Sequence, residues 1–139
     1  MNHLNTRLGV LDSFRSLSET LELAPAVEQL GYHRYWLAEH PPQPSPVLTA
    51  TLVAQQTMRM RIGTAGILFP FYSPIKAAYD FQLLEAAYPG RIDTGFCAGW
   101  APPSLLPDLL DGRPAQRDPV AYKRRVVTLI QRLRTTPDR

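Results

Sequence analysis

The sequence contains a single cysteine, Cys97, among 139 residues, so no disulfide can form within one chain. A lone thiol of this kind suits a reducing compartment. No apolar run reaches the length of a membrane span, and residues 1–20 lack the apolar segment of a secretion signal. These absences predict a soluble, cytoplasmic protein without a membrane partner.

Several catalytic signatures are also missing. The sequence has no Cys/His spacing typical of a metal site, no glycine-rich phosphate loop and no Gly-x-Ser-x-Gly elbow. We therefore expect no metal site, and we set aside phosphate-loop enzymes and hydrolases with a nucleophilic serine.

Charge is distributed unevenly, although the net value is only +3. Lysine and arginine number 7 against 10 acidic residues over 1–112, but 8 against 2 over 113–139. The simplest interpretation of the basic end is a solvated helix face. Contact with an acidic partner surface is the sharper alternative. Nucleic acid is disfavoured, because the basic residues are not interleaved with aromatic ones.

Strand and helix patterns alternate along the chain. Short apolar runs predict strands, and three Ser-Pro or Asp-Pro pairs predict helix starts, because Ser and Asp cap a helix and Pro fits its first turn. The expected strands are 8–12, 35–38, 62–68 and 92–97, and the expected helices are 16–30 and those starting at Ser45, Ser73 and Asp118. Mostly apolar strands are typical of a parallel sheet covered on both faces.

Two helices carry more detailed expectations. Ser16 and Glu19 form a capping-box pattern at the start of the first helix, and Pro25 inside it predicts a kink or a break. In the last helix the residues at helical spacing form one apolar stripe: Tyr122, Val126, Ile130 and Leu133.

The pattern predicts one (β/α)4 domain of the α/β class over residues 1–139. A long 99–118 loop, a candidate lid or docking segment, precedes a basic C-terminal helix at 118–134. A complete (β/α)8 barrel needs about 200 residues or more. Four strands leave two edges unpaired and one face uncovered. We expect oligomerisation to complete the sheet, through a two-fold homodimer or another subunit; a rearranged open sheet is the third possibility.

The most informative segment is 31–40, a turn followed by a short strand that ends at Glu39 and His40. In α/β folds, ligands and chemistry collect at the carboxyl ends of strands. A histidine there can move a proton near neutral pH, and Glu39 can orient its ring. Structural roles are equally open: His40 can pair with a neighbouring carboxylate, and Glu39 can belong to a core salt bridge.

Four motifs in order resemble the bacterial luciferase-like, flavin-dependent monooxygenase family. They are GYHRYWLAEH at 31–40, RIGTAGI at 61–67, SPIK at 73–76 and LLEAAYPGRIDTGF at 83–96. The similarity extends from about Leu8 to Gly99. The resemblance implies the N-terminal half of a TIM barrel, the (β/α)8 fold, with reduced FMN at the carboxyl ends of the strands.

By this resemblance, His40 matches the family's catalytic histidine, with Glu39 beside it. Thr64, Ala65 and Gly66 match a strand segment that passes against the flavin ring, where small residues let a planar ring approach the backbone. The structural alternative is that the glycine only makes this strand narrower, so that it packs inside a barrel.

Cys97 matches a cysteine that lies near the flavin in some family members, although a buried cysteine is usually a small apolar residue. Two positions depart from the family pattern. Pro41 stands where a second histidine is frequent, and Ala98 stands where the family carries an arginine that helps to hold the FMN phosphate. The first departure removes an imidazole and stiffens the loop. The second, with the rest of the family's phosphate contacts lying in the other half of the barrel, predicts weak FMN binding by this chain alone.

The resemblance therefore implies a truncated subunit of a monooxygenase that uses reduced FMN and dioxygen on an organic substrate, inactive alone and working in a multi-chain complex. A longer luciferase-like protein is the favoured partner, a second copy is the alternative, and a flavin reductase is a further candidate. The alternative function is a non-catalytic partner that stabilises or regulates a full-length flavoenzyme.

Overall fold

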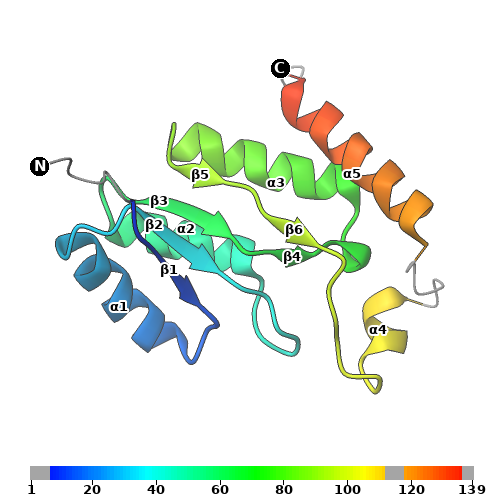
Figure 1. The fold of residues 1–139 in the computed structure, drawn as a ribbon, viewed down its shortest axis with the longest axis horizontal. Coiled ribbons are helices and arrows are strands. Elements are labelled where there is room, and N and C mark those ends of the chain that lie inside the picture. Colours follow the sequence, from blue (N-terminus) through cyan, green and yellow to red (C-terminus); the bar gives the residue numbers. More distant parts are fainter. Residues whose placement is uncertain (1–6, 112–117, 136–139) are drawn as a thin grey trace, which may run out of the picture.

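The computed structural model describes residues 7–111 and 118–135. Its central sheet is parallel with strand order β1-β2-β3-β5, and a second parallel pair, β4-β6, continues it (Figure 1). The strands are β1 (Gly9–Asp12), β2 (Arg34–Leu37), β3 (Arg61–Thr64), β4 (Ile67–Leu68), β5 (Ile92–Asp93) and β6 (Phe96–Cys97). The predicted alternation of strands and helices is confirmed.

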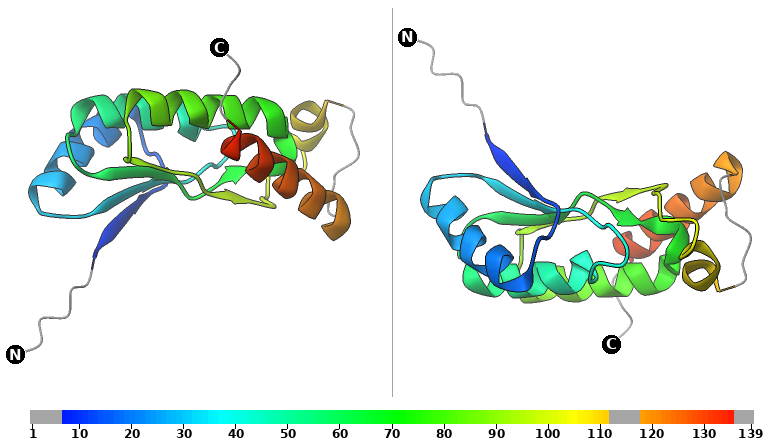
Figure 2. Two further views of the ribbon diagram at one scale, coloured as in Figure 1. Left: turned by 90° about the horizontal axis from the view of Figure 1, so that it is seen from above. Right: turned by 90° about the horizontal axis from the view of Figure 1, so that it is seen from below.

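The helices up to residue 87 connect successive strands, and the last two helices follow the last strand. The helices are α1 (Leu17–Gln29), α2 (Pro46–Gln56), the short 3-10 helix η1 (Phe69–Phe71), α3 (Pro74–Ala87), α4 (Leu106–Leu110) and α5 (Pro119–Arg134). Figure 2 shows α1, α2 and α3 together on one face of the sheet. Over the residues that the structure describes, none of these three covers the opposite face of β1, β2 and β3. Coverage of both faces, as the apolar strands suggested, is therefore not found.

Side chains alternate between the two faces of the sheet, as the pleat requires. Tyr35, Leu37 and Ile62 point toward the helices and are buried in the core, where they meet residues such as Ala24 and Val53. The intervening positions point the other way. We call that side the open face and define it by these residues: Gly9, Leu11, Arg34, Trp36, Arg61, Gly63 and Asp93.

Helix α1 starts as predicted. The Ser16 hydroxyl accepts a hydrogen bond from the Glu19 backbone N–H and donates one to its carboxylate. The break expected at Pro25 is wrong, because α1 continues through it. Buried Ala24 and Val27 hold the helix against the sheet on both sides of the proline, so packing offsets the lost backbone bond.

The three predicted proline-started helices are present, with one difference in their caps. The Ser73 hydroxyl and the Asp118 carboxylate accept backbone hydrogen bonds from the first turns of α3 and α5. The Ser45 side chain makes no capping bond at the start of α2. Its neighbour Thr49 instead donates its hydroxyl to the Ser45 carbonyl oxygen, and this bond also ties the first turn.

The strands expected at 62–68 and 92–97 are each divided in two. Ala65-Gly66 is a cis peptide bond that separates β3 from β4, and Gly95 separates β5 from β6. A Cβ atom on Gly95 would lie 2.0 Å from the Thr64 carbonyl oxygen. The Thr64 hydroxyl also donates to the Gly95 carbonyl at 2.7 Å, so the two breaks lie directly against each other.

Helix α5 packs on α3, and its apolar stripe differs from the predicted one. Leu129 is fully buried, and Tyr122, Val126 and Leu133 pack against the core. Ile130, which the stripe included, is 36% exposed. A shift of one position turns the stripe toward Leu129, because each residue advances about 100° around a helix.

The expected 99–118 loop contains the short helix α4, and 112–117 of that loop lie outside the described residues. None of the helices in the described ranges is long and apolar enough to cross a membrane.

We predict that Gly95→Ala lowers the free energy of unfolding by about 2–3 kcal/mol, because its Cβ would overlap the backbone of the neighbouring strand. Urea denaturation measures the change. Gly9→Ala is the matched control, since its Cβ would meet its nearest atoms at 3.3 Å. Equal stability of the two variants would contradict the close strand contact.

Candidate functional site

A shallow depression lies on the open face, at the carboxyl ends of the central strands. Its volume is about 480 Å³, within the range of small-molecule sites. Its lining consists of Leu11, Trp36, Thr64, Ala65, Gly66, Gly95, Phe96 and Cys97. The structure thus brings together all four residues predicted from the sequence to bind the cofactor: Thr64, Ala65, Gly66 and Cys97.

The chemistry of the depression is that of an apolar, backbone-rich surface. A Cβ on Gly66 would lie 2.7 Å from the Phe96 backbone nitrogen, so only glycine permits this strand contact. The exposed Ala65 presents only a methyl group beside it. A flat ring can therefore approach the main chain at this point. Within the described residues, no charged side chain lines the depression, which suits a neutral ring better than an anion.

Cys97 lies at one side of the depression with its thiol partly buried. The sulfur is 3.7 Å from the Ile67 carbonyl oxygen and 3.9 Å from that of Gly66, so its hydrogen bonds are weak. Burial raises the pKa of the thiol, and the charge of Glu39 adds to the effect. The thiol form therefore predominates at neutral pH, as expected for a small apolar residue rather than a nucleophile.

Glu39 has a different role from the one predicted. Its carboxylate accepts a hydrogen bond from the Leu68 backbone N–H at 2.5 Å and another from the Tyr72 hydroxyl. Both oxygens are thereby engaged, and no bond to His40 is present in the described structure. The expectation that Glu39 orients His40 is wrong. Glu39 instead ties the end of β2 to β4, the strand that follows the cis peptide.

His40 is exposed, and its ring has no hydrogen-bond partner among the residues described. It does not line the depression. Its carbonyl oxygen accepts from Gln43 N–H at 2.9 Å, in a turn that contains the cis Pro41-Pro42 peptide. The structure therefore brings the predicted cofactor residues together but leaves the predicted catalytic histidine exposed and outside the lining of the depression.

Arg125 on α5 supports the depression from behind, a role that the sequence interpretation missed. Its guanidinium donates to the backbone carbonyls of Phe69 and Tyr72 in η1 and at its end, and lies over the Phe69 ring. Phe69 in turn packs against Phe96 with ring centroids 5.4 Å apart. The sequence signal was available, because position 125 falls one residue before Val126 on the inner side of an otherwise basic helix.

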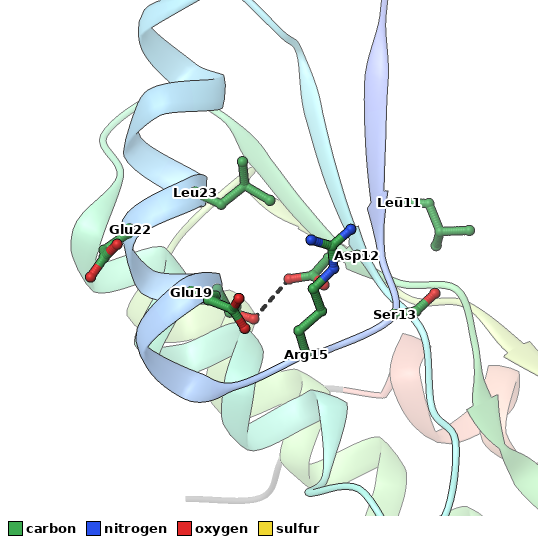
Figure 3. Close-up of a pocket in the computed structure, with 8 residues that line it drawn as sticks. Leu11, Asp12, Ser13, Arg15, Glu19, Glu22 and Leu23 are labelled. Atoms are coloured by element: carbon green, nitrogen blue, oxygen red, sulfur yellow. Dashed lines mark hydrogen bonds between the residues drawn. The ribbon is translucent and has the colours of Figure 1, made fainter.

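A second cavity, of about 600 Å³, lies between β1 and α1 (Figure 3). Asp12 at its base is buried, and accepts hydrogen bonds from the Thr20 hydroxyl at 2.8 Å and the Tyr35 hydroxyl at 2.6 Å. Burial raises the pKa of Tyr35, and the hydrogen bond to the negatively charged Asp12 raises it further. In Figure 3 Arg15 and Glu19 lie near this carboxylate. Both of these hydroxyl bonds go to Asp12 Oδ2, which joins β1 to β2 and α1, while Oδ1 accepts the Phe14 backbone N–H at 2.7 Å in the loop after β1. Both carboxylate oxygens are therefore engaged, which indicates a structural role.

The Asp12 cluster was also missed from the sequence. The available signal was an acidic residue ending an apolar strand, as in the GVLD segment of β1. No group of three or more His, Cys, Asp or Glu residues in the described ranges could hold a metal ion.

The fold and the depression agree with the family assignment. The family model for luciferase-like monooxygenases matches residues 3–138, so the chain belongs to the luciferase-like monooxygenase family. The parallel sheet is part of the TIM barrel of that family.

Curated relatives match a part of this chain and a smaller share of their own length. A luciferase-like monooxygenase of Escherichia coli K12 is 42% identical over 94 residues, which is 64% of this chain and 28% of that protein. The oxygenase component of flavin-dependent trigonelline monooxygenase from Acinetobacter baylyi is 31% identical over 86 residues, covering 58% and 24% of the two chains. The chain thus spans about a quarter of the length of these relatives.

Solved structures give the same picture. Apo-MsnO8 superposes with a TM-score of 0.83 and 30% identity over 96% of this chain and 45% of its own. The oxygenating constituent of 3,6-diketocamphane monooxygenase from Pseudomonas putida, solved in complex with FMN, matches with a TM-score of 0.64 and 23% identity over 72% and 31% of the chains. This second likeness supports the fold alone.

The raised pKa of Cys97 predicts slow alkylation near neutral pH. Since the reactive species is the thiolate, the rate of iodoacetamide labelling should still be rising as pH passes 9.0, the ordinary value for a thiol. Intact mass follows this single site, and the urea-unfolded chain is the control. A rate that has already reached its plateau at pH 8 would contradict the burial of the thiol.

Proposed function

We propose that this chain is part of a flavin-dependent monooxygenase that uses reduced FMN and dioxygen to oxidise an organic substrate, in a cytoplasmic multi-chain complex. The single observation that carries the proposal is the depression itself. It places the backbone of Ala65 and Gly66 at an apolar surface large enough for a planar ring. Family membership and the flavin-dependent relatives support the same cofactor class.

The fit of the described residues to FMN differs between its two ends. The apolar lining and the absence of bulk at Ala65 and Gly66 suit the ring system. A phosphate dianion needs several donors or a helix N-terminus. Ala98 supplies neither, and the described lining contains no cation. We infer that this chain contributes the ring-binding part of the site, and that the phosphate contacts come from elsewhere in the complex.

When bound, reduced FMN supplies the electrons for activating dioxygen. The residues of this chain then have separate roles. The backbone at Thr64, Ala65 and Gly66 supports one face of the ring. Trp36 and Leu11 extend the apolar lining of the depression along the open face. Glu39 keeps β4 in place through the Leu68 amide. His40, exposed after the end of β2, can hold or donate a proton once a neighbouring surface covers it.

The second candidate function is a non-catalytic partner that stabilises or regulates a full-length flavoenzyme. It is favoured by the exposed position of His40 outside the depression, and by Pro41 and Ala98, which remove an imidazole and a cation. In that case the ring surface would be retained only for packing against the partner.

The partners follow from the sheet. Among the described strands, β1 pairs only with β2, and β5 only with β3, so each central-sheet edge has unused backbone hydrogen-bonding groups. We propose that a longer luciferase-like protein completes the sheet, with a second copy as the alternative. A flavin reductase would supply reduced FMN to the complex.

We predict that riboflavin and FMN bind this chain with similar, weak affinity, within about threefold, because no phosphate contact contributes. Of the two tryptophans in the sequence, Trp36 lines the depression. Trp100→Phe therefore leaves Trp36 as the only tryptophan, and its fluorescence quenching measures binding. A preference for FMN above about tenfold, or 1.4 kcal/mol, would show a phosphate site in this chain.

Ala65→Leu should abolish the quenching, because a larger side chain would occupy the ring surface. Ala26→Leu, at an exposed position of α1, is the matched control and should leave it unchanged. Equal quenching of wild type and Ala65→Leu would place the flavin elsewhere.

We also predict that His40→Ala lowers turnover of the complex purified from its native host by about 10²-fold or more, as for loss of a general acid or base, without changing its assembly. Turnover and size-exclusion chromatography are measured together. His33→Ala is the control, since His33 lies before β2 and, within the described ranges, its side chain is hydrogen-bonded to Arg7 and not to any residue of the depression. Unchanged turnover in His40→Ala would favour the non-catalytic function.

A further inference from the structure

The open face carries a cluster of three charged side chains near the amino ends of the strands. Asp93 Oδ2 accepts hydrogen bonds from Arg34 Nε and Arg61 Nε, both at 2.9 Å, and its Oδ1 accepts from Arg61 Nη2 at 2.5 Å. The register of the sheet explains this meeting. Arg34 lies opposite Arg61 on the neighbouring strand. Asp93 lies opposite Gly63, two residues further along β3 than Arg61, and glycine leaves space for both guanidinium groups.

The cluster is unbalanced by one positive charge, because two guanidinium groups share one carboxylate. Asp93 is fully engaged, and the two guanidinium groups lower its pKa, that of Arg61 first. Arg61 also donates to the carbonyl oxygens of Gly90 and Ile92. Arg34 uses only Nε, and its two terminal nitrogens have no partner in the described ranges.

Among the described residues, Asp93 is the only carboxylate bonded to the two guanidinium groups. The pKa of His33 is lowered, first by partial loss of solvent and to a smaller extent by the charges of Arg7, Arg34 and Arg61. The effect of these charges indicates an excess of positive charge at the amino ends of the strands. Glu85 attracts Arg61 more weakly, and its carboxylate is bonded to the Gly90 backbone N–H at 2.6 Å.

Closing the barrel would cover this cluster. The side chains of Arg34 and Asp93 are now 36% and 21% exposed, so water still solvates the excess charge. A segment that pairs with the free edges of β1 and β5 would bring its own inward side chains over the open face. Burying a guanidinium group without a counter-charge has an unfavourable free energy, so a purely apolar surface cannot cover the open face at Arg34.

We propose that the open face is covered by a complementary half-barrel that places a carboxylate against the terminal nitrogens of Arg34. This charge requirement decides against a second copy of this chain, the alternative partner named above. This inference rests on the proposed function only in requiring that the barrel be closed. Two copies related by a two-fold axis would bring their clusters into one interior, with two positive charges in excess. Like charges in one interface act as a barrier to the wrong partner.

A charge-swapped copy tests the proposal without an identified partner. Arg34→Glu changes the open face from an excess of one positive to one negative charge. The wild-type chain alone and Arg34→Glu alone should sediment as monomers. An equimolar mixture should form a one-to-one dimer, with association at least about tenfold tighter than either protein alone and weakened by added salt.

Two further variants complete the experiment. Arg124→Glu, on the exposed side of α5, makes the same change in net charge and should not associate with the wild type. Arg34→Gln neutralises the open face and should self-associate more than the wild type, and this carries the test if Arg34→Glu does not fold, as judged by circular dichroism.

A wild-type dimer that Arg34→Gln does not strengthen, or folded mixtures that remain monomeric, would overturn the proposal. The measurement involves no flavin. Failure of flavin binding therefore tests the proposed function separately from the charge requirement of the open face.

Discussion

The contact between Thr64 and Gly95 is the constraint on which the carboxyl end of this sheet depends. The Thr64 carbonyl oxygen lies where a side chain at position 95 would begin, and the two residues exchange hydrogen bonds through the Thr64 hydroxyl. Neither strand can continue straight past this point. Both turn together, and their continuations pair as β4 and β6. The turn exposes the backbone around Ala65, and the depression exists because two strands break at the same level.

The segment that follows the bend, from β4 to the end of η1, is held by side chains from distant parts of the sequence. Glu39, at the end of β2, accepts the Leu68 amide and the Tyr72 hydroxyl. Arg125 on α5 donates to the carbonyl of the same Tyr72. The depression is therefore supported by a carboxylate on one side and a guanidinium on the other. The basic C-terminal helix has at least this one internal role, besides the solvated face that its charge pattern indicates.

The sequence predicted element types well because local rules determine them. The Ser-Pro and Asp-Pro pairs each start a helix, and the apolar runs form strands. What it could not predict depends on contacts between distant segments. The strands expected at 62–68 and 92–97 are divided because the two segments contact each other at Thr64 and Gly95. No local sequence pattern predicts that contact. Glu39 was assigned to its sequence neighbour His40, whereas its partners lie 29 and 33 residues further along. Pro25 failed to break α1 because tertiary packing overrode propensity.

The open face links these observations to function. Toward the carboxyl ends of the strands it is apolar and lined by small residues, which suits a neutral ring. Toward the amino ends it holds Arg34, Arg61 and Asp93 with one positive charge in excess. A surface with both features differs from an ordinary exposed sheet, where charges are spread and solvated on both sides. Under the proposed function, its apolar end requires a cover to exclude water from a flavin, and its charged end restricts which cover fits. The proposed ring site and the proposed choice of partner would then be two consequences of the same uncovered layer. The indole of Trp36, which lies across Gly63, separates the two ends.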